Sequence, residues 1–145
     1  MRQINKIIIH CADTPEGKVF DSTDIKKWHL ERGFSDIGYH YVILLDGTIE
    51  TGREIKRSGA HTKGHNLNSI GICYIGGKNK EFTESKDTRT CEQKDSFDYL
   101  LNTLIRIYPD CEILGHYQAT ETSKKCPSFD AKEEYKSIKK PEYNN

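Results

Sequence analysis

The stretch Lys6-Ile7-Ile8-Ile9-His10 predicts a short buried strand, because it is brief, apolar and rich in β-branched side chains. Two later stretches have a similar character, residues 69–75 and residues 112–116. The first and last of the three each end in a histidine, His10 and His116. Since the end of a strand in a rigid sheet holds a side chain in a fixed direction, these two imidazoles are candidates for a common site.

A hairpin is predicted between the first two of these strands. Residues 38–45 alternate in polarity and are rich in Tyr, Val and Ile, so they predict a strand. Asp46-Gly47 follows, which is a strong hairpin signal, and residues 48–51 are expected to return antiparallel. Residues 12–20 and 58–68 contain the glycines, Pro and Asn that are typical of loops, and residues 78–89 are polar and expected to be exposed.

Three helices are expected. Asp21 or Ser22 caps the first, which ends near Gly33. Thr90 and Gln93 form a capping-box pattern at the start of the second. Apolar residues follow at helical spacing until Pro109: Phe97, Leu100, Leu101, Leu104 and Ile105. Asp130 caps a short third helix, from which Tyr135 and Ile138 are expected to pack inward.

The interleaving of strands and helices predicts an α/β fold, with a central mixed β-sheet flanked by helices. At 145 residues, the chain has the size of a single domain, residues 1–145. Residues 139–145 are expected to form a flexible tail.

Composition excludes several classes of protein. Lys plus Arg and Asp plus Glu both number 22, and the resulting formal net charge of zero argues against nucleic acid as the main partner. No apolar run is long enough to span a membrane. The apolar stretch near the N-terminus is too short for a signal peptide. We therefore expect synthesis in the cytoplasm without a signal peptide, or a signal that has been removed.

The cysteines do not resemble a disulfide framework, since there are five of them without tight spacing. Cys11, Cys73 and Cys111 are expected to be small buried hydrophobic residues. Cys126, in Cys126-Pro127-Ser128-Phe129-Asp130, is different because His116 lies ten residues before it. A thiolate and a neutral imidazole are both zinc ligands, and His10 is the best candidate for a third. Three protein ligands leave a fourth position open, as in a catalytic zinc site, although a lone His-x9-Cys pair is often accidental.

Ordered motifs along nearly the whole chain resemble the zinc-dependent N-acetylmuramoyl-L-alanine amidases of the type-2 family, which includes phage lysozymes and peptidoglycan recognition proteins. The motifs are Ile8-Ile9-His10-Cys11, Trp28-His29, Gly38-Tyr39-His40-Tyr41-Val42-Ile43, Asp46-Gly47-Thr48, Gly52-Arg53, Gly59-Ala60-His61-Thr62-Lys63-Gly64-His65-Asn66, Asn68-Ser69-Ile70-Gly71-Ile72-Cys73, Gly76-Gly77, Gly115-His116 and Lys124-Lys125-Cys126-Pro127-Ser128-Phe129-Asp130. No single motif is specific, but the ordered set is.

The resemblance implies one Zn²⁺ per chain, held by His10, His116 and Cys126. It also implies that Tyr39 and Lys124 flank the metal as catalytic residues. Zinc lowers the pKa of a bound water and polarises a carbonyl, and a cation such as Lys124 stabilises the developing oxyanion. The implied reaction is hydrolysis of the amide between N-acetylmuramic acid and L-alanine in bacterial peptidoglycan.

The implied protein is a phage- or prophage-type endolysin that acts on the cell wall after release. We expect it to be a monomer.

Two departures from the family pattern stand near the metal ligands. Gln118 occupies a position where many relatives have Asp, two residues after the second histidine. The segment from His116 to Cys126 is also longer by two residues than in the phage lysozymes. Because of this difference in length, either Lys124 or Lys125 could correspond to the catalytic lysine of the family. We choose Lys124, because the family lysine lies two residues before the cysteine.

Structural roles compete with these functional ones. Tyr39 has the character of an ordinary strand aromatic, and Lys124 with Lys125 that of a solvated pair. Trp28 is expected in the core. His29 and His40 are expected to be structural, or to orient a metal ligand.

His61 and Asn66 lie on a Gly-rich loop and are predicted to bind glycan or peptide, with ordinary loop chemistry as the alternative. The alternative function is a peptidoglycan-binding module of the same fold that does not cut. Because Cys126 and both histidines are present, the enzyme is favoured. A role in restraining an RNA polymerase, as in some phage lysozymes, is not tested by the sequence.

Overall fold

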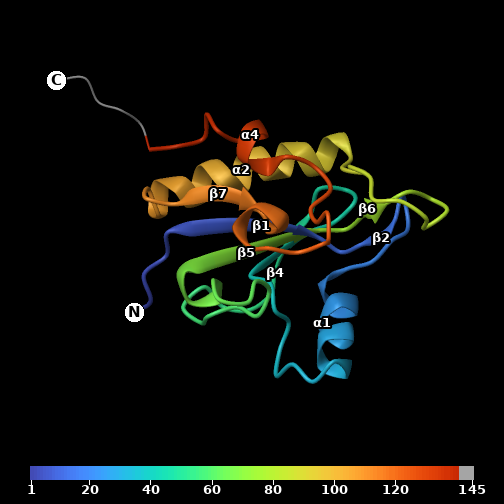
Figure 1. Ribbon diagram of the computed structural model, residues 1–145, viewed down its shortest axis with the longest axis horizontal. Coiled ribbons are helices and arrows are strands. Elements are labelled where there is room, and N and C mark those ends of the chain that lie inside the picture. Colours follow the sequence, from blue (N-terminus) through green and yellow to red (C-terminus); the bar gives the residue numbers. More distant parts are fainter. Residues whose placement is uncertain (141–145) are drawn as a thin grey trace.

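The strand β1 (Lys6–Cys11) lies inside a five-stranded sheet in the computed structural model, which describes residues 1–140 (Figure 1). The strand order is β4-β3-β5-β1-β7. The other strands are β3 (Tyr41–Ile43), β4 (Ile49–Thr51), β5 (Ser69–Tyr74) and β7 (Glu112–Gly115). Strand β4 is antiparallel to β3, whereas all the other pairs are parallel. This confirms the predicted mixed sheet.

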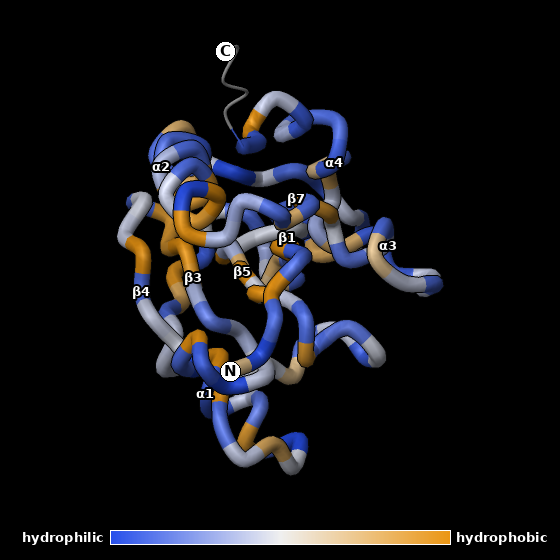
Figure 2. Tube along the Cα trace, turned by 90° about the vertical axis from the view of Figure 1, so that its left-hand side faces the viewer, coloured by the Kyte–Doolittle hydropathy of each residue, from blue (hydrophilic) through white to orange (hydrophobic). Residues whose placement is uncertain are grey.

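Side chains of the central strands alternate between two faces of the sheet. Ile7 and Ile9 of β1 belong to a large apolar cluster that also contains Phe97 and Leu101. These two come from α2 (Cys91–Ile107), which packs on that face together with α4 (Ala131–Glu134). The opposite face holds a smaller cluster with α1 (Ser22–Glu31). Figure 1 shows α1 on the opposite side of the sheet from α2 and α4, and Figure 2 shows the apolar strands between them. His10 is therefore directed away from α2, because it follows Ile9.

The predicted helix caps are present. Asp21 and Thr90 each accept a hydrogen bond from the third residue of the following helix, which closes two capping boxes. Asp130 accepts from the backbone of Glu133 at the start of α4. Gly33 follows α1 with φ 92°, a conformation that glycine adopts without strain. The Asp46-Gly47 turn is also confirmed, with Gly47 at φ 89°.

Some boundaries differ from the sequence prediction. Strand β3 begins at Tyr41, so Tyr39 lies in the segment that leads into it. Strand β7 ends at Gly115, and His116 begins the short helix α3 (His116–Ala119). A small second sheet was missed, in which β2 (Thr14–Pro15) pairs with β6 (Gly77–Lys78). Strands of two residues are too short to show the periodicity from which strands are predicted.

Of the predicted tail, residues 139–145, Lys139 and Lys140 are exposed and belong to no helix or strand, and the flexibility of the tail stays a prediction. Residues 141–145 lie outside the described residues.

A 3-10 helix, η1 (Asn66–Asn68), interrupts the predicted loop before β5. None of the helices within residues 1–140 combines the length and apolar character needed to cross a bilayer.

The segment before α2 was expected to be exposed, but Arg89 is buried. Its guanidinium donates hydrogen bonds of 2.7–2.9 Å to the carboxylates of Asp87 and Glu134 and to the Tyr135 hydroxyl. The guanidinium carbon also lies 3.4 Å from the ring centre of Phe129. Arg89 thus ties the start of α2 to α4 and to the segment that follows Cys126. The prediction failed because polarity alone does not reveal that a charged residue has buried partners.

We predict that Arg89→Met lowers the free energy of unfolding by about 2–3 kcal/mol, because it removes the hydrogen bonds of a buried guanidinium to two carboxylates and to the Tyr135 hydroxyl. The measurement is urea unfolding at pH 7. Arg106→Met, at an exposed position of α2, is the matched control and should change stability by less than about 0.5 kcal/mol. Equal stability of the two variants would contradict this role of Arg89.

Candidate metal centre

His10 and His116 meet because β1 and β7 are parallel neighbours. The register pairs Ile9 with Gly115, so His10 and His116, the residues that follow them in the chain, stand side by side at the same edge of the sheet. Neighbouring strands are about 4.8 Å apart, and the two imidazole ring centres are 4.7 Å apart. Two residues separated by more than a hundred positions are thus placed together by one strand pairing.

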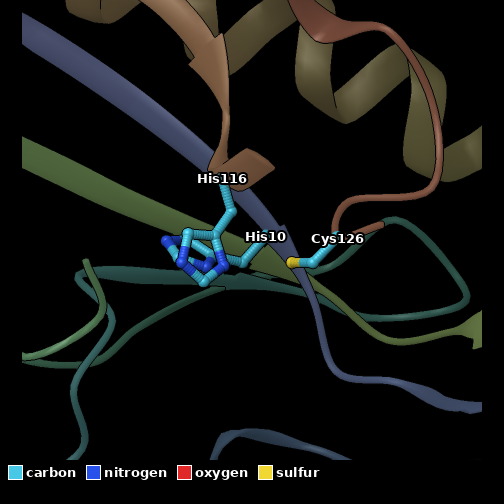
Figure 3. A group of neighbouring side chains, drawn as sticks. All are labelled: His10, His116 and Cys126. Atoms are coloured by element: carbon cyan, nitrogen blue, oxygen red, sulfur yellow. The ribbon is translucent and has the colours of Figure 1, made fainter. Parts of the chain in front are cut away.

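Cys126 reaches the same place from the segment between α3 and α4. Its sulfur accepts a hydrogen bond of 3.1 Å from the backbone amide of Cys11, the residue after His10. The candidate ligand atoms of His10, His116 and Cys126 all lie within 4.8 Å of one another. Figure 3 shows the sulfur and both rings directed toward one region. The structure therefore brings together the three predicted ligands.

The protonation states of the histidines suit a metal. Burial lowers the pKa of His10 well below its usual range, and the neighbouring His61 and His116 lower it further. Burial also lowers the pKa of His116. Both rings are thus neutral at neutral pH, which is the state in which imidazole binds a metal. Two imidazole nitrogens and one sulfur form a donor set that zinc prefers.

A hydrogen-bonded chain lies behind His10. Its Nε2 is 2.9 Å from Nδ1 of His61 and 3.2 Å from Oγ1 of Thr62. The Thr62 hydroxyl is also 2.9 Å from Nδ1 of His61. The other ring nitrogen of His61, Nε2, is 3.3 Å from the Ser69 hydroxyl. One proton lies between Nε2 of His10 and Nδ1 of His61, and the tautomer that places it on His10 leaves Nδ1 of His10 free for a metal. Such partners fix the tautomer and orientation of a ligand histidine.

The position of His61 depends on Gly71 of β5. A side chain at Gly71 would place its Cβ 2.5–2.7 Å from the His61 ring, so only glycine fits. A glycine inside a strand often marks a place where another group comes close to the backbone, and here that group is the His61 ring. On the other side of the loop, the Asn66 side-chain oxygen accepts from the backbone amides of His61 and Thr62, at 2.9 and 2.8 Å. Both predicted substrate-binding residues are thus also parts of the support of His10, and their contact with substrate stays a prediction.

A cavity of about 320 Å³ opens in front of the three candidate ligands. Tyr39 and Lys124, the predicted catalytic residues, both line it, as do His61 and Asn66. Lys125 does not line this cavity but belongs to a neighbouring one. The geometry therefore favours Lys124 over Lys125 as the cation beside the ligands.

Tyr39 is held in place by aromatic neighbours. Its ring centre lies 5.0 Å from that of His10 and 5.3 Å from that of His29. Burial raises the pKa of the Tyr39 phenol well above its usual range, so the hydroxyl keeps its proton at neutral pH. His29 in turn accepts a hydrogen bond of 2.9 Å from the backbone amide of Gly38.

The remaining predicted structural residues are also accounted for. His40 accepts from the amide of Gly71 at 3.0 Å, so it supports the same glycine that makes room for His61. Cys11, Cys73 and Cys111 are buried as predicted, whereas Trp28 is only half-buried at the edge of the smaller cluster.

Sequence reasoning missed several residues of the site. Thr62 stands beside His61 in a quoted motif, but only the fold shows that its hydroxyl touches His10. Asp13, Arg32 and Lys63 line the cavity and were not singled out. Asp13 has φ 56°, an uncommon conformation outside glycine, which marks the sharp bend after β1.

The departure at Gln118 leaves the ligands in place. Its side-chain oxygen accepts a hydrogen bond of 2.8 Å from the amide of Gly115 and so caps α3, which begins at His116. Its amide nitrogen donates to Asp130 at 2.6 Å. A neutral side chain therefore orients the His116 segment at this position.

Comparison with known proteins gives a consistent result. The family model described as N-acetylmuramoyl-L-alanine amidase matches residues 1–129. The endolysin of Escherichia phage T7 is 38% identical over 126 residues, which cover 87% of this chain and 82% of that protein. The solved endolysin amidase LysCS from Clostridium intestinale URNW has a TM-score of 0.77 at 31% identity, with coverage of 94% and 83%.

A mutant of Drosophila PGRP-LB, solved in complex with tracheal cytotoxin, has a TM-score of 0.75 at 29% identity, and the match covers 94% of this chain and 82% of that one. These matches confirm the predicted fold class.

Stability of the metal-free protein should fall as the pH is lowered from 7.5 to 5. Burial lowers the pKa of His29 and His40 to about 4 and that of His61 to about 3. Since the unfolded chain titrates near pH ~6.5, it binds more protons than the folded chain in this range. The neutral histidines therefore contribute their full stabilisation above about pH 6.5, and this contribution is lost as the pH falls below that value.

We expect a loss of about 1–2 kcal/mol per histidine, measured by urea unfolding at each pH with a chelator present. His40→Gln should make the dependence shallower. An unfolding free energy that does not change between pH 7.5 and 5 would show that these rings are not held neutral.

Proposed function

The chain belongs to the N-acetylmuramoyl-L-alanine amidase family, and we propose that it cuts its substrate with one zinc ion held by His10, His116 and Cys126. It is an amidase of the endolysin type, which hydrolyses the bond between N-acetylmuramic acid and L-alanine in peptidoglycan. The observation that carries the zinc proposal is the convergence of two neutral imidazoles and one sulfur on the wall of a cavity.

The donor set suits a catalytic rather than a structural metal. Structural zinc has four protein ligands, whereas catalytic zinc has three and an open position. Here three candidate ligands converge, and the cavity lies in front of them. When bound, zinc supplies Lewis-acid chemistry, because it polarises a carbonyl and lowers the pKa of water.

Lys124 is the cation that stabilises the oxyanion in this proposal. It lines the cavity, and its positive charge contributes to the lowered pKa of both His10 and His116, so its field acts at the ligands. A cation placed where negative charge develops during amide hydrolysis lowers the barrier most effectively.

Tyr39 acts as a hydrogen-bond donor. Its raised phenol pKa keeps the proton on the oxygen, so the group donates to the substrate carbonyl or orients the attacking water.

Asn66 contributes a contact to the substrate. Its side-chain oxygen accepts from two backbone amides, its NH₂ group makes no hydrogen bond within residues 1–140, and the residue lines the cavity. A peptide or acetamido carbonyl is the partner that fits such a donor. We assign His61 a double role, as a support of His10 and as part of the wall that the substrate touches.

The partner is peptidoglycan, which we expect the protein to meet as a monomer, after release from the cytoplasm. The alternative is a module of the same fold that only binds, and a mutant of PGRP-LB in complex with tracheal cytotoxin shows that a relative of this fold binds such a ligand. The presence of the complete set His10, His116 and Cys126 supports cleavage instead.

We predict that the purified protein carries about one zinc per chain and that Cys126→Ala loses the metal and releases no stem peptides from cell-wall sacculi. Chelation of the unchanged protein should have the same effect, and added zinc should restore activity. Cys91→Ala, at an exposed cysteine, is the matched control and should keep both metal and activity. Full hydrolysis by the Cys126→Ala protein would contradict the mechanism.

Lys124→Ala should lower kcat by roughly 10²–10³ with zinc retained, since a stabilising charge is lost but no ligand. Lys125→Ala should cost much less, and Lys27→Ala on α1 serves as a neutral control. Zinc content and steady-state kinetics on muropeptides are measured together. A larger loss in Lys125→Ala than in Lys124→Ala would move the catalytic role to the neighbouring lysine.

A further inference from the structure

A second cavity, of about 510 Å³, adjoins the metal centre. Lys124 lines both cavities, so the two meet at this side chain. Its walls come mostly from the segment between α3 and α4 and include Tyr117, Thr122, Ser123, Ser128 and Phe129. None of these residues has a role in the catalytic proposal.

The walls combine aromatic rings with hydroxyl groups. Tyr117 is 38% exposed, a large fraction for an aromatic side chain beside a cavity. Phe129 is fixed from behind, because the Arg89 guanidinium stacks on its ring. Thr122 accepts from the amide of Lys124 at 3.2 Å, which leaves its hydroxyl hydrogen free to donate. Ser128 donates to the carbonyl of Gly77 at 3.1 Å, and its oxygen also lies 3.9 Å from the Cys11 sulfur.

The two cavities also differ in charge. The metal cavity contains Arg32, Lys63 and Lys124 against one carboxylate, Asp13, and so it has an excess of positive charge. Apart from the shared Lys124, the second cavity has one charge of each sign, Lys125 and Asp130.

The substrate has two unlike parts on the two sides of the bond that is cut. The stem peptide carries free carboxylates, which match the cationic metal cavity. The glycan presents neutral sugar rings with hydroxyl and acetamido groups, which match exposed aromatic rings and hydroxyls. We propose that the second cavity binds the glycan strand, at the N-acetylated sugar next to the muramoyl residue. This inference rests on the proposed function and adds the place of the sugar chain to it.

Binding without cleavage provides the first test. The probe is the tetramer of N-acetylglucosamine, which contains no scissile amide, titrated into the full chain by NMR or calorimetry. Tyr117→Ala should weaken binding on the order of 5- to 10-fold, because a stacking ring is lost. Tyr117→Phe should bind nearly as the unchanged protein does. Tyr99→Ala, at a tyrosine that is 69% exposed on α2, is the matched control and should have no effect.

Kinetics provide the second test. For glycan strands several disaccharides long, Tyr117→Ala should raise KM by a similar factor and leave kcat unchanged. For an N-acetylmuramoyl peptide without neighbouring sugars, the same change should leave KM unchanged. The backbone amide of Tyr117, which donates to the Cys126 carbonyl at 3.1 Å, remains in every variant.

Two outcomes in which the tetramer does bind would overturn the glycan assignment. One is tetramer binding that does not respond to Tyr117→Ala. The other is that free stem peptide displaces the tetramer from the unchanged protein but not from the Lys125→Ala variant. That result would place the peptide in this cavity. If the tetramer binds as expected but no amide is cut, the glycan site stands and the proposed amidase mechanism fails. If the amide is cut normally but the tetramer does not bind, the amidase mechanism stands and the glycan site fails.

Discussion

The pairing of β1 with β7 is the constraint on which the metal centre depends. Because Ile9 stands opposite Gly115 in a parallel register, His10 and His116 leave the sheet at the same edge and on the same face. A slip of one residue would turn one of the two rings to the opposite face of the sheet. The register is itself held by burial, since Ile7, Ile8 and Ile9 are completely buried between two layers of side chains. The apolar character of β1 thus positions the polar residue at its end.

The third ligand depends on different contacts. Cys126 lies in a segment without helix or strand, and it is anchored at both ends. Its sulfur accepts the Cys11 amide, while three residues later Phe129 packs beneath the buried Arg89. These contacts hold the loop that carries the third ligand. Thr62 and His61 in turn orient His10, the ligand on β1.

Much of the fold followed from local patterns, because its signals are local. The runs of isoleucine, the Asp46-Gly47 turn and the capping residues Thr90 and Asp130 each act within a few positions. The pairing of β2 with β6 and the burial of Arg89 were missed, because both depend on partners distant in sequence. Of the site, the ligands and the flanking Tyr39 and Lys124 came from an ordered set of motifs, whereas the strand register that unites them became visible only in three dimensions. Thr62 and Asp13 carry no sequence signal that separates them from ordinary loop residues.

The most direct test of the central claim is X-ray absorption at the zinc edge, on protein reconstituted with one equivalent of zinc. The account predicts two nitrogen scatterers at about 2.0–2.1 Å and one sulfur at about 2.3 Å, with a further light atom in the fourth position. A spectrum with no sulfur scatterer, or with four protein ligands that close the site, would contradict it.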